Sequence, residues 1–257
     1  MTQQKTVLIT GASGGIGREL AFQFAKDGYK LVLVARSENK LQMLADELSP
    51  APVSIKVKDI SSSEGVYELV NELKVENNKV DVLVNNAGFG LYGEFTETSI
   101  NEELNMIDLN IKTLTLLTKL LLPSMVQNKT GHILNVASVA AFQPGPLMAV
   151  YYATKAYVLS FSEALENELQ GTGVGVSVLC PGPTETGFSD RANLEQSKLF
   201  KGKVMDAESV AKLGYAGMKQ KKSVIIPGLK NRLLTILVRL LSRKTVTKVV
   251  RNAQERR

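Results

Sequence analysis

Three side chains stand at spacings that suit proton transfer. Tyr151 and Lys155 are four residues apart in a stretch with helical spacing that runs on through Leu165, so they share one face of the predicted helix. A phenol with a pKa of about 10 is a poor acid or base near neutrality, but a neighbouring ammonium stabilises the phenolate and lowers that pKa. Ser138 lies upstream of Tyr151, at the end of the apolar strand predicted over Ile133 to Ala137. Because ligands bind at the carboxyl ends of parallel strands, the Ser138 hydroxyl can meet the helix that follows.

A second group is the glycine-rich turn Thr10 to Gly17, which follows a predicted strand and opens a predicted helix. A dinucleotide pyrophosphate needs a close backbone approach and a helix N-terminus to meet its charge, and glycine supplies both the turn and the clearance. The spacing Gly11-x3-Gly15-x-Gly17 differs from the common G-x-G-x-x-G fingerprint. Simple packing of a strand against a helix is the alternative explanation of such a turn.

Arg36 stands at the end of the second predicted strand, where a carboxylate that binds the adenosine ribose is expected in an NAD-binding protein. A guanidinium pairs with a 2′-phosphate through two parallel hydrogen bonds, whereas a carboxylate repels it. The residue therefore favours NADP(H), with NAD(H) less favoured. A solvated arginine neutralised by nearby Glu38 is the alternative.

These residues need a scaffold of alternating strands and helices. Apolar runs typical of buried parallel strands are separated by helical patterns throughout the chain. This alternation predicts an α/β fold, a single doubly wound Rossmann-type domain with a seven-stranded parallel sheet and helices on both faces. We expect a catalytic domain over residues 1–228 and an extension over 229–257, with an irregular stretch at 183–203 where a lid would lie. The predicted strands are Thr6 to Thr10, Leu31 to Ala35, Val53 to Val57, Val80 to Val84, His132 to Val136, Val174 to Leu179 and Ser223 to Ile226.

Taken together, the motifs resemble those of the classical short-chain dehydrogenases/reductases, over about residues 5 to 228. Besides the glycine turn, Ser138, Tyr151 and Lys155, four further motifs occur in the same order as in the family. They are Asp59-Ile60, Asn85-Asn86-Ala87-Gly88, Asn110 and Pro181-Gly182 with Thr186. One departure is Tyr152, where members often carry a smaller residue.

The resemblance implies a role for each matching residue. Tyr151 is then the acid in carbonyl reduction and the base in alcohol oxidation, and Ser138 bonds the substrate oxygen. Lys155 binds the nicotinamide ribose and lowers the pKa of Tyr151, while Asn110 holds a water that relays protons to Lys155. The cofactor contacts implied by the family and by the residues themselves are Gly11, Ser13, Gly15, Ile16, Gly17, Arg36, Asp59, Ile60, Asn86, Ala87, Gly88, Tyr151, Lys155, Pro181, Gly182, Thr184 and Thr186.

Composition and charge exclude several classes of protein. The 257 residues are 44% hydrophobic and 22% charged, as in ordinary globular proteins. One cysteine and one histidine make a metal site improbable, and we take Cys180 as a core residue and His132 as a surface residue. The net charge of +6 resides in residues 228–257, which hold nine basic side chains and one acid, so residues 1–227 carry a net −2. A nucleic-acid-binding body is therefore not expected.

The extension has the pattern of a basic amphipathic helix over Lys230 to Arg243, with leucines opposite Arg232 and Arg239. Three placements remain open: docking over the cleft or on a second subunit, lying on an anionic membrane surface, or forming a solvated arm. We expect a cytoplasmic protein, peripheral at a membrane if the second placement holds, because neither a signal segment nor a spanning segment is evident.

The predicted activity is hydride transfer between NADP(H) and a carbonyl/alcohol pair, with a lipophilic ketone or aldehyde as substrate. The residues expected on the substrate side are bulky and apolar, as in most small-molecule pockets. A 3-oxoacyl-carrier-protein reductase is an alternative within enzymes, and a dinucleotide-binding regulatory or membrane-recruited module is the alternative outside them. The resemblance also implies a homo-oligomer, a dimer or tetramer. The expected substrate-side residues are Phe89, Gly90, Leu91, Tyr92, Phe142, Leu147, Met148 and Phe188.

Overall fold

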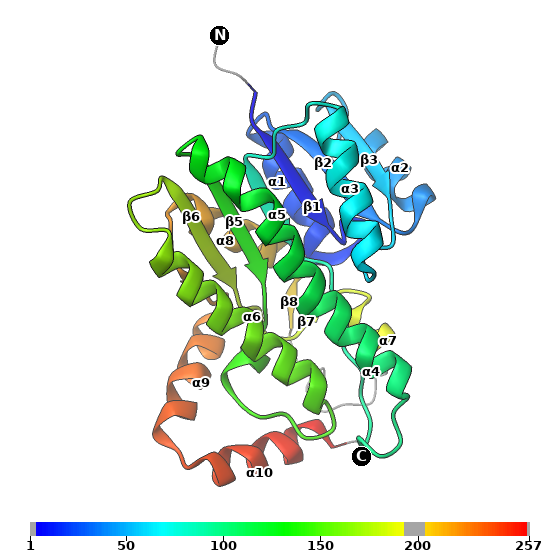
Figure 1. Ribbon diagram of the computed structural model, residues 1–257. Helices are drawn as coiled ribbons and strands as arrows, with labels where there is room; N and C mark the ends of the chain where they lie inside the picture. The colour runs from blue at the N-terminus through cyan, green and yellow to red at the C-terminus, as the bar shows by residue number, and fades with distance from the viewer. Residues whose placement is uncertain (1–3, 193–203, 256–257) are drawn as a thin grey trace.

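A computed structural model describes residues 4–192 and 204–255 of the chain (Figure 1). Its centre is one sheet of seven parallel strands in the order β3-β2-β1-β4-β5-β6-β9. The predicted doubly wound architecture is therefore confirmed. The sheet strands are β1 (Thr6–Thr10), β2 (Lys30–Ala35), β3 (Val53–Val57), β4 (Val82–Asn85), β5 (Gly131–Val136), β6 (Val174–Leu179) and β9 (Val224–Ile225).

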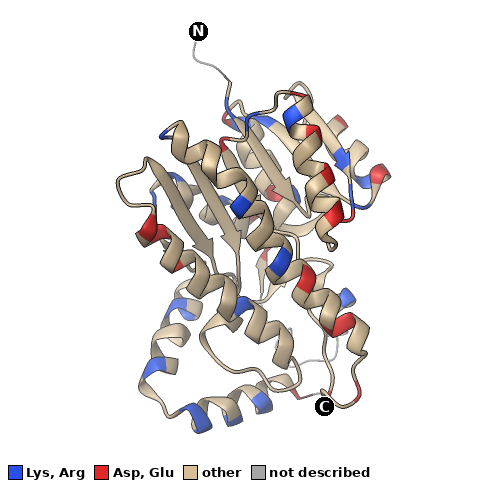
Figure 2. Cartoon of the chain, viewed as in Figure 1, with Lys and Arg blue, Asp and Glu red and all other residues tan. Residues whose placement is uncertain are grey.

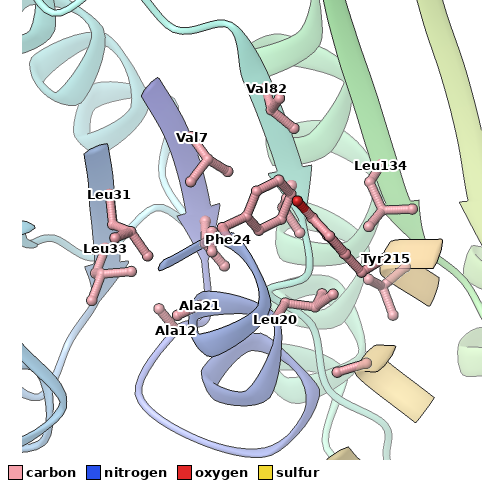
Figure 3. Close-up of a cluster of buried hydrophobic side chains, with 14 of the residues drawn as sticks. Val7, Ala12, Leu20, Ala21, Phe24, Leu31, Leu33, Val82, Leu134 and Tyr215 are labelled. Carbon is pink, nitrogen blue, oxygen red and sulfur yellow. The ribbon is translucent and has the colours of Figure 1, made fainter. Parts of the chain in front are cut away.

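Helices cover both faces of this sheet because the strands are apolar on both sides. On one face α1, α2 and α8 pack against alternate strand residues such as Val7 and Leu31, and Phe24 of α1 meets Tyr215 of α8 edge to face at 4.8 Å (Figure 3). On the other face α3, α5 and α6 pack against the intervening residues, among them Leu8 and Val32. The helices named here are α1 (Gly15–Lys26), α2 (Glu38–Glu47), α3 (Ser63–Val75), α5 (Leu114–Gln127), α6 (Ala149–Glu168) and α8 (Ala207–Lys219).

The remaining elements surround the carboxyl edge of the sheet. Helix α4 (Ile100–Ile107) passes through a π-helical turn (Asp108–Thr113) into α5, and a 3₁₀ turn (Val139–Phe142) follows β5. After β6, strands β7 (Thr184–Glu185) and β8 (Met205–Asp206) pair in parallel, with α7 (Phe188–Arg191) between them. Residues 193–203, the second part of the stretch where a lid was expected, lie outside the described residues.

The extension after Gly228 folds as two helices, α9 (Leu229–Leu240) and α10 (Arg243–Gln254), which we call the C-terminal arm. The prediction of one helix through Arg243 was wrong, because Leu241 is extended and the Ser242 hydroxyl caps a new helix by accepting from the Thr245 amide. Tyr92 donates its hydroxyl to the Gln254 carbonyl at 2.9 Å, and Arg251 pairs with Glu94 at 2.7 Å. The arm thus folds back beneath the carboxyl edge (Figure 1).

His132, expected at the surface, is instead half-buried at the start of β5. Its Nε2 lies 2.9 Å from the Ser177 hydroxyl, which itself donates to the Lys222 carbonyl, so Nε2 carries the proton. A Cβ added at Gly175 would lie 2.5 Å from Nδ1, so the other ring nitrogen faces backbone. Burial, aided by the charge of Lys221, lowers the pKa of His132 to about 4.

This histidine predicts an acid-sensitive fold. The unfolded chain has the higher histidine pKa, about 6.5, so it binds the proton first and the folded state loses stability as pH falls below that value. From pH 7 to about pH 5 we expect His132 to contribute a loss of about 2 kcal/mol in the free energy of unfolding. Urea unfolding of the wild type and of His132→Gln at both pH values measures it. Carboxylates titrate in both proteins, so an equal pH dependence in the two would contradict the assignment.

Candidate active site

A cavity of about 760 Å³ opens at the carboxyl edge of the sheet, and residues at the ends of the strands and in the loops after β1 to β6 line it. Parallel strands bring their carboxyl ends to one edge, which is why residues far apart in the sequence meet here. All the predicted site residues except Gly17 and Asn110 line this cavity. They are Gly11, Ser13, Gly15, Ile16, Arg36, Asp59, Ile60, Asn86, Ala87, Gly88, Ser138, Tyr151, Lys155, Pro181, Gly182, Thr184 and Thr186.

The glycine turn is held against the loop after β4 by a polar latch. The Thr10 hydroxyl accepts from the amides of Asn86 at 3.1 Å and Ala87 at 3.0 Å, and it donates to the Val84 carbonyl. The Asn86 side-chain amide in turn donates to the carbonyls of Thr10 and Gly11, at 3.0 and 3.1 Å. The turn therefore has its shape before any ligand binds.

This turn fits the diphosphate of a dinucleotide. Gly11 and Gly15 have φ values of +64° and +53°, which favour glycine, and no side chain caps the N-terminus of α1. Its first amides therefore point at the cavity with their partial positive charge. Gly17 lies beneath the turn, where a Cβ would come 2.5 Å from the Gly11 carbonyl oxygen and 2.4 Å from the Asn86 amide nitrogen. Its place is in close helix packing, not on the cavity wall.

The loop after β6 closes the same region from the other side. A Cβ on Gly15 would lie 3.2 Å from the Thr186 methyl, so this loop and the glycine turn are in contact distance. Thr186 accepts from the Phe188 amide and Thr184 donates to the Gly182 carbonyl, which fixes the loop's course. The two loops together form a cleft with backbone on both walls.

Arg36 and Asp59 lie at the far end of the cavity, after β2 and β3. The Asp59 carboxylate accepts from the amide and hydroxyl of Ser61, and these bonds, with the charges of Arg36 and Arg191, hold its pKa below the ordinary value. Burial, together with Arg36, lowers the pKa of Arg191, whose guanidinium lies 4.2 Å from the Phe89 ring centroid. Sequence reasoning missed Arg191, since no pattern placed it opposite Arg36.

Tyr151 and Ser138 meet at the other end. The two side chains lie close together, and Ser138 accepts from the Ala140 amide at 3.1 Å and donates to the Pro181 carbonyl at 3.4 Å, which orients its hydroxyl. Tyr151 is 8% exposed and its ring contacts Phe188. Burial raises the pKa of Tyr151 to about 12, against the smaller opposing effect of Ser138. Its hydroxyl is therefore protonated at neutral pH and points at the cavity as a donor.

Lys155 lies one helical turn further along α6, as the spacing predicts. Its ammonium donates to the Val136 carbonyl at 2.9 Å and lies 5.9 Å from the centroid of the Tyr151 ring. Burial lowers the pKa of Lys155 to about 8. Burial is the largest influence on the pKa of both groups, and the expectation that Lys155 lowers the pKa of Tyr151 stays a prediction.

Asn110 lies in the π-helical turn and is buried behind the cavity. Its side chain accepts from the Phe89 amide and donates to the Phe89 carbonyl and the Thr154 hydroxyl, at 3.1, 2.9 and 3.0 Å. A Cβ on Gly88 would lie 2.8 Å from Asn110 Oδ1 and 3.5 Å from Lys155 Nζ. Asn110 therefore fixes the Phe89 loop and the helix that carries Tyr151.

A buried amide network supports these residues from within the sheet, and sequence reasoning missed it. Asn85 at the end of β4 donates to Asn135 of β5 at 2.9 Å and to Thr118 of α5 at 3.2 Å. Asn135 donates to Ser162 of α6 at 2.9 Å. Polar residues within otherwise apolar strands were the signal that could have identified it.

Most residues expected on the substrate side line the cavity, and three do not. Phe89, Gly90, Leu91, Met148 and Phe188 lie on its wall. Tyr92 and Leu147 line an adjoining cleft near Arg251, and Phe142 packs beside Val158, away from the cavity. Their places are taken by residues that were not expected there, namely Leu109, Val139, Ala140, Gln143, Tyr152 and Leu234.

The glycine packing gives a test of dinucleotide binding. A methyl group at Gly17 meets the Gly11 carbonyl and so displaces the turn from α1, and we expect Gly17→Ala to weaken NADPH binding at least about tenfold. Gly28→Ala is the control, because a Cβ there meets no protein atom within 4 Å and Gly28, whose φ of +76° makes the change a mild strain on folding, does not line the cavity. NADPH fluorescence titration measures both, with the melting temperature as a check on folding. Equal affinities in the two variants would contradict this role of Gly17.

Comparison with known proteins identifies relatives with the same architecture. A family model described as short chain dehydrogenase matches residues 5–197. An uncharacterized oxidoreductase of Staphylococcus saprophyticus is 38% identical over 190 residues, which cover 73% of this chain and 81% of the relative.

Solved structures extend the likeness over the C-terminal arm. A short-chain dehydrogenase from Sphingobium yanoikuyae in complex with NADPH is 33% identical with a TM-score of 0.83, covering 98% of each chain. The bulky-bulky ketone specific alcohol dehydrogenase from Comamonas testosteroni is 29% identical with a TM-score of 0.80, covering 99% of this chain and 98% of that one. Other similar structures hold NAD or NADP.

The family match spans most of the chain, and the glycine turn, Ser138, Tyr151 and Lys155 lie together at one edge of the sheet. This protein belongs to the short-chain dehydrogenase family of NAD(P)-binding oxidoreductases.

Proposed function

We propose that this enzyme reduces a lipophilic ketone or aldehyde with NADPH. The observation that carries the proposal is the pair of neighbouring hydroxyls of Ser138 and Tyr151, set in a cavity that also holds the glycine turn. Two hydroxyls at one point suit a carbonyl oxygen, which accepts hydrogen bonds from both. A bound nicotinamide dinucleotide supplies the hydride for such a reaction.

The side chains of Ser138, Tyr151 and Lys155 supply substrate binding, proton transfer and charge stabilisation. Ser138 and Tyr151 bind and orient the carbonyl oxygen, and Tyr151 gives its proton to that oxygen as negative charge develops there. Burial keeps the Tyr151 hydroxyl protonated at neutral pH, since its pKa is about 12. Lys155, with a pKa of about 8, is still positively charged near pH 7. Its charge stabilises the negative charge left on the phenolate oxygen of Tyr151.

Support for NADPH comes from the charges around the adenosine end. Arg36 and Lys40 both line the cavity there, and Arg36 lies near enough to Arg191 to lower the pKa of that guanidinium. An anion bound between two neighbouring cations reduces the repulsion between them, and a 2′-phosphate is such an anion. The residue directly after β2 is an arginine where a carboxylate favours NAD.

Support for a lipophilic substrate comes from the apolar and aromatic side chains that line the cavity. Among them are Met148 and Tyr152 at the start of α6 and Leu234 of α9. The similar enzyme from Comamonas testosteroni is specific for bulky-bulky ketones, which fits a wall of this kind. A 3-oxoacyl thioester shares the ketone chemistry and belongs in the substrate panel.

Self-association and a cytoplasmic place of action belong to the same proposal. Ile100, Leu104 and Ile107 form an exposed apolar stripe along α4, with 63%, 52% and 37% of each residue accessible. Positions i, i+4 and i+7 share one helix face, which suits contact with a second copy. Within the described residues no helix is long and apolar enough to cross a membrane.

Replacing the acid tests the activity. We expect Tyr151→Phe to lower kcat for reduction of lipophilic ketones by at least about 100-fold, because the proton donor is lost while the ring stays. NADPH affinity should stay within about threefold, since the ring still fills its site. Tyr157→Phe is the matched control, a tyrosine on the same helix whose hydroxyl contacts Thr115 on the outer surface. Steady-state kinetics with purified variants decides, and full activity of Tyr151→Phe would exclude this mechanism.

A separate test addresses cofactor preference. Removing the guanidinium in Arg36→Ala should raise the Kd for NADPH about 10- to 100-fold, the usual worth of charge-assisted hydrogen bonds to a phosphate. NADH lacks the 2′-phosphate and serves as the internal control, with its Kd unchanged within about threefold. Fluorescence titration with both nucleotides gives the ratio. An unchanged ratio would show that Arg36 does not read the phosphate.

A further inference from the structure

Helix α9 presents an apolar face to solvent although it is attached firmly to the protein. Asn231, Thr235 and Val238 face inward: Asn231 lies against Gly182, Thr235 is 6% exposed, and Val238 packs with the cluster around Tyr151. At 3.6 residues per turn, five other residues fall within an arc of about 100° on the opposite side. This apolar stripe consists of Leu229, Leu233, Ile236, Leu237 and Leu240, which are 74%, 53%, 52%, 50% and 76% exposed.

Cations border the apolar stripe on both sides. Arg232 and Arg239 lie along one edge and Lys230 along the other, all exposed. Helix α10 adds Arg243, Lys244, Lys248 and Arg251, and the sequence has no acidic residue from position 209 to 254 (Figure 2). The surface of the arm is therefore an apolar strip within a strongly positive field.

We propose that this surface docks the enzyme on an anionic lipid bilayer, with α9 lying in the plane of the interface. Leucine side chains then enter the boundary between headgroups and acyl chains while the flanking arginines and lysine meet lipid phosphates. A twelve-residue helix lies on a bilayer and does not span it.

Charge distinguishes this occupant from a second copy of the chain. Arg251 pairs with Glu94, so a two-fold contact through α9 would place the other six cations of one arm beside the six of its partner, and like charges oppose such a contact. An anionic lipid surface has the complementary sign.

The position of α9 connects the docked surface with the cavity. Asn231 and Leu234 line the cavity wall, while Leu233 and Leu237 of the same helix belong to the apolar stripe. A docked enzyme therefore has its substrate opening beside the bilayer. This last step rests on the proposed function: a lipophilic ketone dissolved in the membrane reaches Ser138 and Tyr151 without crossing water.

Co-sedimentation with vesicles tests the docking. The full-length protein is mixed with phosphatidylcholine vesicles that contain, or lack, about 30% phosphatidylglycerol, at low and high salt. We expect binding to the anionic vesicles at low salt and release at high salt. The stripe variant Leu233→Gln/Leu237→Gln/Leu240→Gln and the edge variant Arg232→Gln/Arg239→Gln should each bind at least about tenfold more weakly.

Matched controls separate the possible outcomes. Met43→Gln/Val75→Gln/Leu213→Gln also removes three exposed apolar side chains, 63%, 88% and 46% accessible, and should bind like the wild type. Melting temperatures show that all variants fold. Tyr151→Phe should also bind normally, so a failure of the proposed catalysis leaves the docking result interpretable.

Two results would overturn the proposal. One is wild-type protein that stays in the supernatant with anionic vesicles, or a stripe variant that binds as the wild type does. The other is an assembly in sedimentation velocity that the stripe variant dissociates, without vesicle binding, which would assign the surface to a second copy.

Discussion

The active edge of this enzyme depends on the buried hydrogen bonds among Asn85, Asn135, Thr118 and Ser162. These residues are 4% exposed or less, and each unmatched partner in such a place costs about 1–3 kcal/mol. The three bonds that form hold β4 against β5, β4 against α5 and β5 against α6, and only Asn85 Oδ1 of this network has no partner among the described residues. The strand register then sets where each chain segment leaves the sheet.

The side chains to which we assign the proposed chemistry take their positions from that register. Ser138 follows β5 by two residues, the Asn86 latch follows β4 by one, and α6 carries Tyr151 and Lys155 from the far side of the same network. The Lys155 ammonium donates to the carbonyl of Val136, the last residue of β5, so the sheet end itself holds the lysine. Catalytic geometry here is a property of how four elements meet more than of any one loop.

Much of this could be predicted from the sequence, because strands buried on both faces leave unbroken apolar runs. All seven strands lie where expected, with shifts at their ends such as β4, which begins at Val82 where Val80 was predicted. Motif spacing likewise indicated the lining of the cavity. Gly17 and Asn110 lie behind the cavity wall. A sequence motif includes residues that hold the glycine turn and the Phe89 loop in shape, and not only residues that a ligand would contact.

What the sequence did not reveal arises from tertiary contacts. The outward direction of the leucines in α9 is set by Asn231 and Thr235, polar residues that the pattern assigned no role. Arg191 opposes Arg36 only through the course of the loop after β6. The half-buried position of His132 depends on Ser177 and on the space left by Gly175.

Helix α10 supports a wall of the cavity from behind, since Val246 and Val250 pack in the cluster that holds Tyr151 and Tyr152. The residues that form the sheet and the proposed cofactor cleft all precede α10 in the sequence, since the last strand is β9. Substitutions in the last part of the chain can therefore change the shape of the cavity, and with it the substrate that fits, without disturbing the strand register. This segment is thus the natural place to engineer substrate specificity. It also means that an affinity tag belongs at the N-terminus, far from Gln254 and its bond to Tyr92 (Figure 1).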